Sequence, residues 1–339
     1  MSHSNGPTPE RIFQKINAFQ SSAALKGALD LGLFTALGDE CKSAAELAEA
    51  IGASEKGVRI LCDFLTIDGL LEKEGAQYRS SADAALFLNE ASPAYFGSVG
   101  RFLLGPDVLA NFADIAGVVR EGGTLAHGEG TVEPENPIWI DFARSMVPLM
   151  RPSADFIADL VTNNGSAGQP LKVLDIAAGH GTFGIAIAGR HAESHITALD
   201  WPAVLDVASE NADKAGVADR HTRLAGSAFD VEFGNGYDVV LLTNFLHHFD
   251  IPTCTNLLRK VHGALKDGGR AVTLEFVPNE DRVTPAEQAS FSLMMLATTA
   301  SGDAYTFREL ESMATDAGFA NSELHRMEGP PQSVIVSTK

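Results

Sequence analysis

Two acids and two closely spaced glycines are the residues of this chain whose order most clearly suggests chemistry. Asp175 belongs to a short apolar run, and Gly179 and Gly181 follow before an apolar segment with helical spacing. This order predicts a buried strand, a tight turn and the start of a helix. Glycines there let the backbone approach a ligand, which the first N–H groups of the helix would face. The same glycines could also do no more than close the turn.

A second acid, Asp200, ends the next predicted strand, 25 residues after Asp175. In a strand–helix–strand unit this acid lies beside the first turn, where a carboxylate can accept both hydroxyls of an adenosine ribose. A dinucleotide and S-adenosylmethionine both fit this arrangement, and Gly184 completes the G-x-G-x-x-G spacing of a dinucleotide turn. Asp175 would repel a pyrophosphate, however, and would suit the cationic amino acid end of S-adenosylmethionine. We therefore favour the second ligand.

Composition and charge limit the classes of function. The 339 residues suffice for two domains, and 45% hydrophobic with 20% charged residues is typical of a soluble globular protein. A net charge of −19 argues against DNA or an anionic membrane as a partner. No stretch approaches the roughly 18 apolar residues of a membrane span, and residues 1–5 are too polar for a signal peptide. We expect a cytoplasmic protein.

The cysteines give no sign of a disulfide framework or a metal site. Cys41, Cys62 and Cys254 are odd in number, and neither they nor the histidines and acids have metal-ligand spacing. Reduced thiols and a protein without bound metal are the expectation.

The N-terminal part has the pattern of a small helical domain. Residues 7–37 carry apolar residues on more than one helical face, as in helices packed between two subunits or inside an ordinary core. Ser43 and Glu46 have the spacing of a capping box before a helix. A second helix around 58–65 and a hairpin over 69–80 complete a winged helix-turn-helix layout.

That layout also suggests a function of another class, a DNA-binding regulator that senses a metabolite. Charge weighs against it, because residues 1–100 hold 8 Lys and Arg but 13 Asp and Glu, a balance of 8 − 13 = −5. Only Lys56 and Arg59 would decorate the recognition helix, whereas a DNA reader needs several phosphate contacts. A scaffold role is the better interpretation.

The C-terminal part alternates between strands and helices. Residues 84–160 look mostly helical, and residues 163–170 have the composition of a linker at a domain boundary. The strands predicted beyond it are 171–176, 195–200, 221–225, 237–242, 270–277, 322–327 and 332–338. The helices predicted among them are 182–190, 202–215, 253–266 and 306–317. Alternation predicts a parallel sheet covered on both faces. Only four residues join the last two strands, so the final strand must be antiparallel. Seven strands with one reversed edge hairpin form the Rossmann-like α/β sheet of S-adenosylmethionine-dependent methyltransferases.

The chain resembles the small-molecule O-methyltransferases of the plant caffeate and hydroxyindole type, and more closely their bacterial relatives. The resemblance rests on the winged-helix half, the turn at 175–181, Asp200-Trp201-Pro202 and the segment 246–249, in that order over nearly the whole chain. It implies a winged-helix dimerisation domain at 1–95, a helical connector at 96–168 that contributes to the substrate pocket, and an S-adenosyl-L-methionine-binding methyltransferase domain at 169–339. It also implies a homodimer that methylates a hydroxyl of an aromatic small molecule.

The resemblance also assigns the cofactor site residue by residue. The family turn is Asp-x-Gly-Gly-Gly-x-Gly, from which this chain departs at Ala177 and Ala178. The family often has an acid near the adenine after the third strand, where this chain has a serine and a phenylalanine that could hydrogen-bond, stack or simply pack. An asparagine near the fourth strand could line the pocket or cap the local turn. The cofactor-binding candidates are Asp175, Gly179, Gly181, Asp200, Trp201, Ser227, Ala228, Phe229 and Asn244.

The family's catalytic base is a histidine just after the fourth strand, which motif register places at His247. A neutral imidazole can take the proton of a phenol, and the oxyanion then attacks the sulfonium methyl in line. His248 is the competing candidate, and either histidine could simply be packed. Glu275 matches the acid that steadies the base, unless it is a solvated residue at a strand end. The family's second acid aligns with Ala304, so that Asp303 substitutes for it or the base has one acidic partner.

Substrate-pocket candidates lie on two predicted helices, although Met and Phe at helical spacing are also typical of a core. They are Phe142, Met146 and Met150 on the first, and Phe291, Met294 and Met295 on the second. If they line a pocket, the acceptor is flat and largely apolar. Methylation at nitrogen or carbon, and a relative that uses the bound cofactor without transferring methyl, remain alternatives alongside the DNA-binding regulator.

Overall fold

The computed structural model of the chain describes residues 7–126, 128–163 and 170–339. Two compact units, Met1–Pro106 and Asp107–Lys339, divide it inside the predicted connector, and the three-part division stays a prediction. The N-terminal residues 1–5 and most of the predicted linker, 164–169, lie outside the described residues. Among the described residues no single helix is long and apolar enough to cross a bilayer, although one bent pair, Gly97–Ala110 with Ile115–Glu121, passes on length and composition together.

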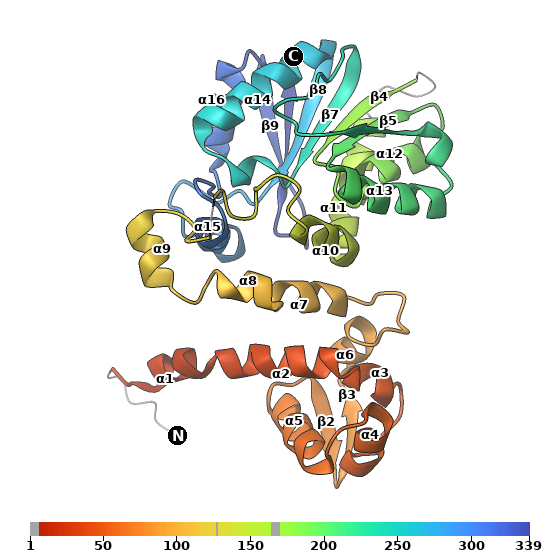
Figure 1. Cartoon of the computed structure of the whole chain (residues 1–339), viewed down its shortest axis with the longest axis vertical. Coiled ribbons are helices and arrows are strands. Elements are labelled where there is room, and N and C mark those ends of the chain that lie inside the picture. Colours follow the sequence, from red (N-terminus) through yellow and green to blue (C-terminus); the bar gives the residue numbers. More distant parts are fainter. Residues whose placement is uncertain (1–6, 127, 164–169) are drawn as a thin grey trace. The chain divides into compact units, whose positions relative to one another are not determined.

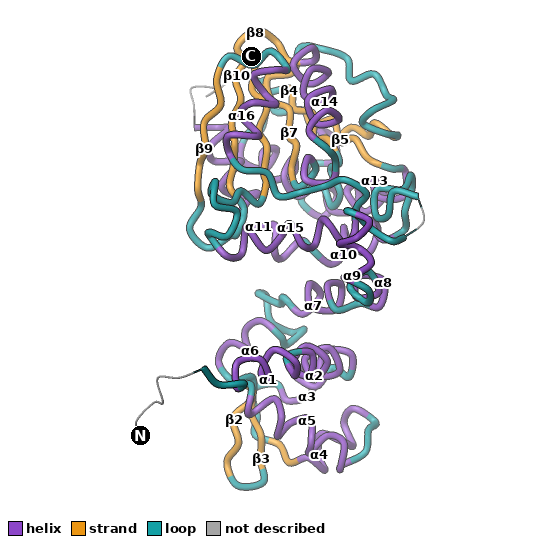
Figure 2. Tube along the Cα trace, turned by 90° about the vertical axis from the view of Figure 1, so that its left-hand side faces the viewer, coloured by secondary structure: helices purple, strands orange, loops and turns teal. Residues whose placement is uncertain are grey.

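The first unit contains the predicted helices and hairpin (Figures 1 and 2). Its helices are α1 Glu10–Asn17, α2 Phe19–Asp30, α3 Leu33–Leu37, α4 Ala44–Ile51, α5 Glu55–Ile67, α6 Ala82–Phe87 and α7 Gly97–Leu103. Its strands, β1 Lys42–Ser43, β2 Leu71–Glu74 and β3 Gln77–Ser80, form a small antiparallel sheet in the order β1-β3-β2. The predicted capping box is present, because the Ser43 hydroxyl accepts from the Glu46 N–H and the Ser43 N–H donates to the Glu46 carboxylate.

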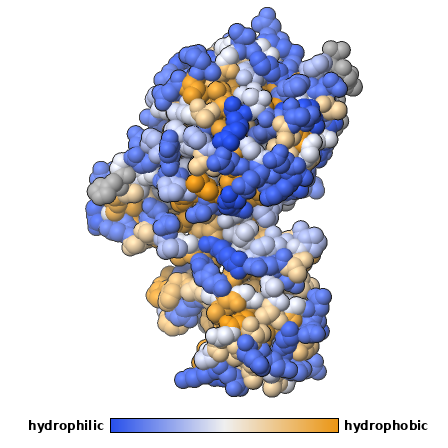
Figure 3. Space-filling model, turned by 45° about the vertical axis from the view of Figure 1, so that its right-hand side comes forward, coloured by the Kyte–Doolittle hydropathy of each residue, from blue (hydrophilic) through white to orange (hydrophobic). Residues whose placement is uncertain are grey.

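The core of this unit covers α2 to α5 and leaves α1 outside. Leu29, Phe34, Leu47 and Leu65 are fully buried, whereas α1 has no buried residue. Four apolar residues here are 64–66% exposed. Ile12, Phe13 and Ile16 form the apolar face of α1, and Phe19 is the first residue of α2. The ordinary-core interpretation of this segment is therefore wrong for α1. Figure 3 shows apolar surface on this unit.

The second unit is built on a seven-stranded sheet with the predicted topology. Its strands are β4 Lys172–Ile176, β5 His195–Asp200, β6 His221–Ala225, β7 Tyr237–Thr243, β8 Leu265–Glu275, β9 Asn321–Arg326 and β10 Ser333–Thr338. The order is β6-β5-β4-β7-β8-β10-β9, and β10 is antiparallel to both of its neighbours. The chain leaves β4 on one side and returns on the other at β7, so the switch point lies between these two strands. Ligands bind outside the carboxyl ends of the strands at such a point.

Helices cover both faces of this sheet (Figure 1). Those on the faces are α11 Val147–Asn163, α12 Thr182–Arg190, α13 Pro202–Lys214, α14 Ile251–Ala264 and α16 Phe307–Asp316. The other helices of this unit are α8 Pro106–Ala110, α9 Ile115–Glu121, α10 Ile138–Ser145 and α15 Ala286–Thr298, with 3-10 turns η1 Ala218–Arg220 and η2 Leu246–His248. Alternate residues of a strand face opposite ways. Leu174 and Ile176 therefore join the core under α14 and α16, while Asp175 between them meets α12 on the other face.

Two details differ from the expectation. The sequence predicts helices over 139–150 and 154–161, but the break falls at Met146, between α10 and α11, and α11 continues through Pro152. The strand predicted at 270–277 begins at Leu265, because the start of β8 pairs with Tyr237 across a register shift. The stretch 122–130, glycine-rich and predicted as a loop, is attached just after α15, where the Thr124 N–H donates to the Thr299 carbonyl over 2.9 Å.

Candidate active site

Asp175 presents a buried carboxylate at the carboxyl end of β4. Its side chain is fully buried, and one oxygen, Oδ2, accepts the Gly184 N–H over 3.1 Å. The other oxygen, Oδ1, has no hydrogen-bond partner among the described residues. Burial raises the pKa of this carboxyl to about 7, the nearby Asp200 adds to the rise, and the Gly184 N–H opposes it. A cationic group of a ligand would satisfy Oδ1 and restore the charged form.

The turn after β4 has a left-handed backbone at three positions. Ala177, Gly179 and Gly181 have φ of 52°, 56° and 73°. A Cβ at Gly181 would also be crowded, lying 3.1 Å from that of Ala208. Ala177 stands at one of the family's glycine positions and adopts the left-handed conformation at a cost of roughly 1–2 kcal/mol. The turn therefore keeps its shape despite the departure from the motif.

The first N–H groups of α12 differ from the expectation that they face the ligand. The Thr182 N–H donates to Nδ1 of His180 over 3.1 Å, and the Gly184 N–H donates to Asp175. A Cβ on Gly184 would lie 2.6 Å from the Ile196 side chain, so this glycine allows α12 to pack closely against the sheet. These two donors are thus used inside the protein.

Asp200 lies beside the same turn, as predicted. Its Oδ2 accepts the Gly179 N–H over 2.8 Å and its Oδ1 accepts the Trp201 N–H over 2.7 Å. Burial raises the pKa of Asp200 to about 6, against the lowering effect of these two hydrogen bonds. Because each carboxylate oxygen has two lone pairs, both oxygens can still accept a ribose hydroxyl.

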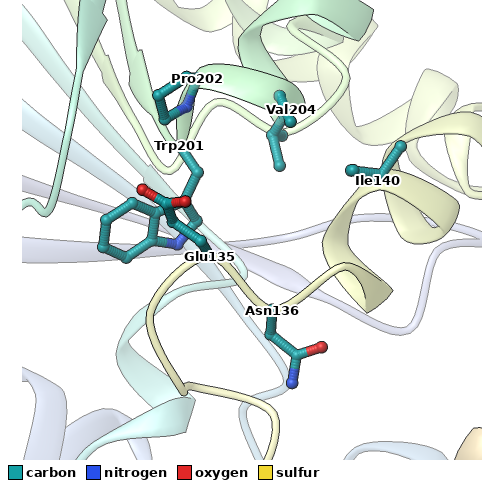
Figure 4. Close-up of a pocket in the computed structure, with 7 residues that line it drawn as sticks. Glu135, Asn136, Ile140, Trp201, Pro202 and Val204 are labelled. Atoms are coloured by element: carbon teal, nitrogen blue, oxygen red, sulfur yellow. The ribbon is translucent and has the colours of Figure 1, made fainter.

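Trp201 lies at the start of α13 and lines a small cavity of about 60 Å³. Figure 4 shows its indole beside the Glu135 side chain. The lining residues are Glu135, Asn136, Ile140, Trp201, Pro202, Ala203 and Val204. One of these residues, Trp201, directly follows Asp200 in the sequence. The size of the cavity suits a water or a small group rather than a nucleoside.

The predicted adenine segment follows β6, and the Gly226 N–H bonds the Asp200 carbonyl. The Ser227 hydroxyl accepts the Phe229 N–H over 3.1 Å, Ala228 is buried, and Phe229 packs edge-to-face on Phe249. Lys260 of α14, which the sequence did not single out, donates to the carbonyls of Ala228 and Phe229 over 2.9 and 3.2 Å. The segment is therefore anchored beside Asp200.

His247 and Glu275 form a buried pair at the carboxyl ends of β7 and β8. Nδ1 of His247 is hydrogen-bonded to Oε2 of Glu275, whose other oxygen accepts the Phe245 and Leu246 N–H groups over 3.2 and 2.9 Å. Glu275 is 2% exposed, so the interpretation as a solvated residue is wrong. A carboxylate on Nδ1 keeps the hydrogen there and leaves the Nε2 lone pair free in the neutral ring.

His248 has a different environment. Its ring lies 4.3 Å from that of His247 and edge-to-face on Trp139 at 5.2 Å. Burial lowers its pKa well below the usual value, and the neighbouring His247 adds to the effect. Its Nδ1 has no partner among the described residues. Within the described part of the chain, no carboxylate is hydrogen-bonded to this ring to stabilise a proton taken up from a ligand.

The family's second acidic position is apolar and is not replaced. Ala304 is fully buried, and the Asp303 carboxylate forms an ion pair with Arg282 at 3.1 Å. Asp303 supports the histidine through its backbone instead, since its N–H donates to the His247 carbonyl over 3.0 Å. Among the described residues, Glu275 is the acid hydrogen-bonded to the His247 ring.

Gly302 contacts the same carbonyl too closely for any larger residue. A Cβ at this position would overlap the His247 carbonyl oxygen and approach the Thr299 hydroxyl to 2.7 Å. The glycine therefore lets the segment after α15 run directly against η2. No sequence pattern indicated this role.

The predicted substrate residues are brought to the site unequally. Phe291 lies edge-to-face on His247 at 4.9 Å and stacks on Phe276 at 3.8 Å. Asn244 has a φ of 54° and places its Nδ2 3.4 Å from the Met150 sulfur. Phe142 lies nearly parallel to the His180 ring at 6.5 Å.

The remaining predicted substrate residues are three methionines. Met146 and Met295 are buried and Met294 is half-buried, which suits a core as well as a pocket. Gln332, which lies buried just before β10 and which the sequence analysis did not single out, has its side chain 3.5 Å from that of Asn244.

The cysteines are free, and the described residues contain no cluster of three or more potential metal ligands.

Replacing Asp175 with asparagine should change how stability depends on pH. The folded ligand-free protein keeps this proton up to about pH 7, whereas the unfolded chain loses it near 3.8, so the wild-type protein loses stability as pH rises between these values. Asp175→Asn lacks this loss, and its stability relative to wild type should rise across the window by up to about 4 kcal/mol. Denaturant unfolding across this pH range measures the difference.

The exposed Asp213→Asn on α13 is the matched control for this experiment. A constant difference between Asp175→Asn and wild type would contradict the raised pKa.

Family models match most of the chain. One described as an O-methyltransferase domain matches residues 149–320, and one described as an O-methyltransferase dimerisation domain matches residues 13–90. The tetracenomycin polyketide synthesis 8-O-methyl transferase of Streptomyces glaucescens is 27% identical over 344 residues, which cover 98% of both chains. The 3-hydroxy-5-methyl-1-naphthoate 3-O-methyltransferase of Streptomyces sahachiroi is 27% identical over 325 residues, covering 92% of this chain and 90% of that protein.

A solved structure has nearly the same fold. The crystal structure of a Nostoc punctiforme protein, assigned provisionally as an O-methyltransferase, matches with a TM-score of 0.95 and 48% identity over 98% of this chain and 100% of that one. The predicted fold class, dimerisation domain and cofactor are thereby confirmed. The chain belongs to the O-methyltransferase family, and it is an enzyme that uses S-adenosyl-L-methionine.

Proposed function

We propose that this enzyme methylates a hydroxyl group of an aromatic small molecule, with His247 as the base. The observation that supports this most is the buried His247–Glu275 pair at the carboxyl ends of β7 and β8, next to the switch point of the sheet. The unpartnered Asp175 oxygen fits the ammonium of the cofactor, and Asp200 fits its ribose. When bound, the cofactor supplies a methyl group activated by a sulfonium.

The role of His247 follows from its hydrogen bonds. A phenol has a pKa near 10 and is only slightly ionised at neutral pH, so a base within hydrogen-bond reach increases its nucleophilicity. Nε2 can take that proton because Glu275 holds the hydrogen on Nδ1 and stabilises the imidazolium that forms. With the cofactor held by Asp175 and Asp200, the ionised oxygen would be the nucleophile for its methyl group, and holding the two reactants together would supply much of the rate.

His248 is the weaker candidate for the base. Its pKa is lowered by burial, and its ring has no acidic partner to stabilise a proton. Its edge-to-face contact with Trp139 makes it part of the aromatic surroundings instead. We therefore assign it a packing role beside the acceptor.

The acceptor class follows from the rings beside His247. Phe276 and Phe291 stack on each other and Phe291 touches the histidine, so a flat apolar ring could pack there with its hydroxyl toward Nε2. The names of two relatives point the same way, one being a naphthoate 3-O-methyltransferase and the other a polyketide 8-O-methyl transferase. Hydroxylated naphthoates and related phenols are the first compounds to screen.

The exposed face of α1 favours a homodimer as the working form. Ile12, Phe13 and Ile16 would each lose accessible apolar area against a second copy, which matches the dimerisation domain found over residues 13–90. The DNA-binding alternative has less support, because Arg59 of α5 is ion-paired with Asp63 at 2.9 Å.

His247→Ala should lower turnover by roughly 100-fold to 10,000-fold, the usual contribution of a general base. Binding of S-adenosylhomocysteine should stay near the wild-type value. Mass spectrometry of acceptor screens measures the gain of one methyl, and fragmentation separates oxygen from nitrogen or carbon products. His248→Gln is the matched control. Turnover retained by His247→Ala and lost in His248→Gln would reverse the assignment.

Gly302→Ala should lower turnover while leaving the cofactor site intact. The added Cβ overlaps the His247 carbonyl and must displace η2, and a shift of about 1 Å can cost on the order of 100-fold. Steady-state kinetics and S-adenosylhomocysteine calorimetry separate the two effects. Gly263→Ala is the control, because a Cβ there meets nothing within 4 Å. Equal activity of both variants would show that Gly302 does not position the histidine.

Ile16→Lys should dissociate the dimer by placing a charge in the apolar face of α1. Gln14→Lys adds the same charge on the opposite side of this helix and should leave the dimer intact. Light scattering coupled to size exclusion gives the mass of each variant in solution. A wild-type protein that elutes as one chain would contradict the dimer.

A further inference from the structure

His180 is a buried histidine inside the cofactor turn that the mechanism above does not use. It lies between Gly179 and Gly181, and its side chain is only 2% exposed. Its Nδ1 accepts the Thr182 N–H, which can only donate, so Nδ1 carries a lone pair and the ring hydrogen is on Nε2. Burial lowers the pKa of His180 to about 4, so the ring is neutral at physiological pH.

The far side of this ring is a hydrogen-bond donor without an acceptor. No hydrogen bond joins Nε2 to a described residue. The ring lies nearly parallel to that of Phe142 at 6.5 Å and tilted against that of Phe183 at 5.8 Å. Nε2 is not one of the fully buried atoms without a partner, so this donor stays within reach of a ligand or of water. Groups left unpaired in this way call for a ligand or a water as partner.

Asp175 makes a complementary arrangement on the same helix start. Its Oδ2 accepts the Gly184 N–H, just as Nδ1 of His180 accepts the Thr182 N–H, each over 3.1 Å. Each side chain thus uses one atom to hold the first turn of α12. Oδ1 of Asp175 is buried without a partner among the described residues, and Nε2 of His180 has no hydrogen bond to a described residue. The free atoms are opposite in kind, an acceptor on the aspartate and a donor on the histidine.

The amino acid end of S-adenosyl-L-methionine requires both kinds of partner. Its ammonium group donates hydrogen bonds and its carboxylate accepts them. Because the Thr182 and Gly184 N–H groups are already engaged, the carboxylate cannot bind to them in the usual way at a helix N-terminus. The His180 ring instead accepts the Thr182 N–H at Nδ1 and offers its own N–H at Nε2, on the other side of the ring. Hydrogen bonds linked in this way polarise one another in the same direction.

We propose that the Nε2–H of His180 binds the carboxylate of the cofactor's amino acid end, while Oδ1 of Asp175 accepts from its ammonium group. The proposal rests on the role given to Asp175 under the proposed function. It makes His180 a cofactor-binding residue at the variable position of the Gly179-x-Gly181 turn. A donor on a neutral ring also adds no positive charge beside the sulfonium.

Two substitutions separate the two sides of the ring. Asparagine can keep an acceptor where Nδ1 stands, as in an Asx turn, and loses the far donor. Glutamine can place its amide N–H groups near the position of Nε2. Calorimetry compares S-adenosylhomocysteine with 5′-methylthioadenosine, which has the same nucleoside and lacks the amino acid end. No acceptor turnover is needed, so the result does not depend on the proposed methylation of a phenol.

His180→Asn should weaken S-adenosylhomocysteine binding by about 10-fold to 100-fold, the range of a hydrogen bond to a charged group. It should leave 5′-methylthioadenosine binding within about twofold, which is inside the scatter expected for a site the change does not touch. His180→Gln should recover most of the lost affinity. An equal loss for both ligands would overturn the proposal by showing a distorted turn. Unchanged S-adenosylhomocysteine binding in His180→Asn would also overturn it.

Discussion

The carboxylate of Glu275 is the group on which the geometry of the histidine side of the site depends. It is buried at the end of β8, and burying a charged group is unfavourable unless hydrogen bonds compensate. Three donors meet it, the His247 ring and the N–H groups of Phe245 and Leu246. One side chain therefore positions the imidazole and the backbone turn that carries it. The pairing of β8 with β7 brings that carboxylate to the turn, so the sheet itself sets the position of the ring.

The strand order explains why the remaining polar groups gather nearby. Asp175, Asp200 and Glu275 each lie at the carboxyl end of a parallel strand, and Asn244 directly follows another. Strands β5, β4, β7 and β8 are consecutive neighbours, so these ends form one edge of the sheet. The helices on the two faces leave that edge to loops. The loops that carry His247 and the turn at Gly179 thus start from rigid strands, which fix where the proposed base and cofactor residues lie.

Much of this arrangement could be predicted from sequence because it depends on local patterns. The sheet strands lie within a few residues of their predicted places, and the capping box at Ser43 is present. Other features depend on contacts between distant segments, which a local pattern does not contain. The continuity of α11 through Pro152, the Lys260 contacts with the adenine segment and the pairing of Asp303 with Arg282 are of this kind. The sequence also left open whether the Glu275 carboxylate is solvated or paired. Its burial beside His247 shows that it is paired.

Ala177 and Asn244 have a shared consequence for the ligand-free enzyme. Both adopt a left-handed backbone, with φ of 52° and 54°, although neither is glycine, and they follow the two strands that flank the switch point. Such conformations cost on the order of 1–3 kcal/mol each and persist only where the surrounding structure imposes them. The two turns are therefore preorganised by the sheet before any nucleoside arrives. Association then requires less loss of conformational entropy than ordering a flexible loop would, and the enzyme accepts a less stable resting state in exchange.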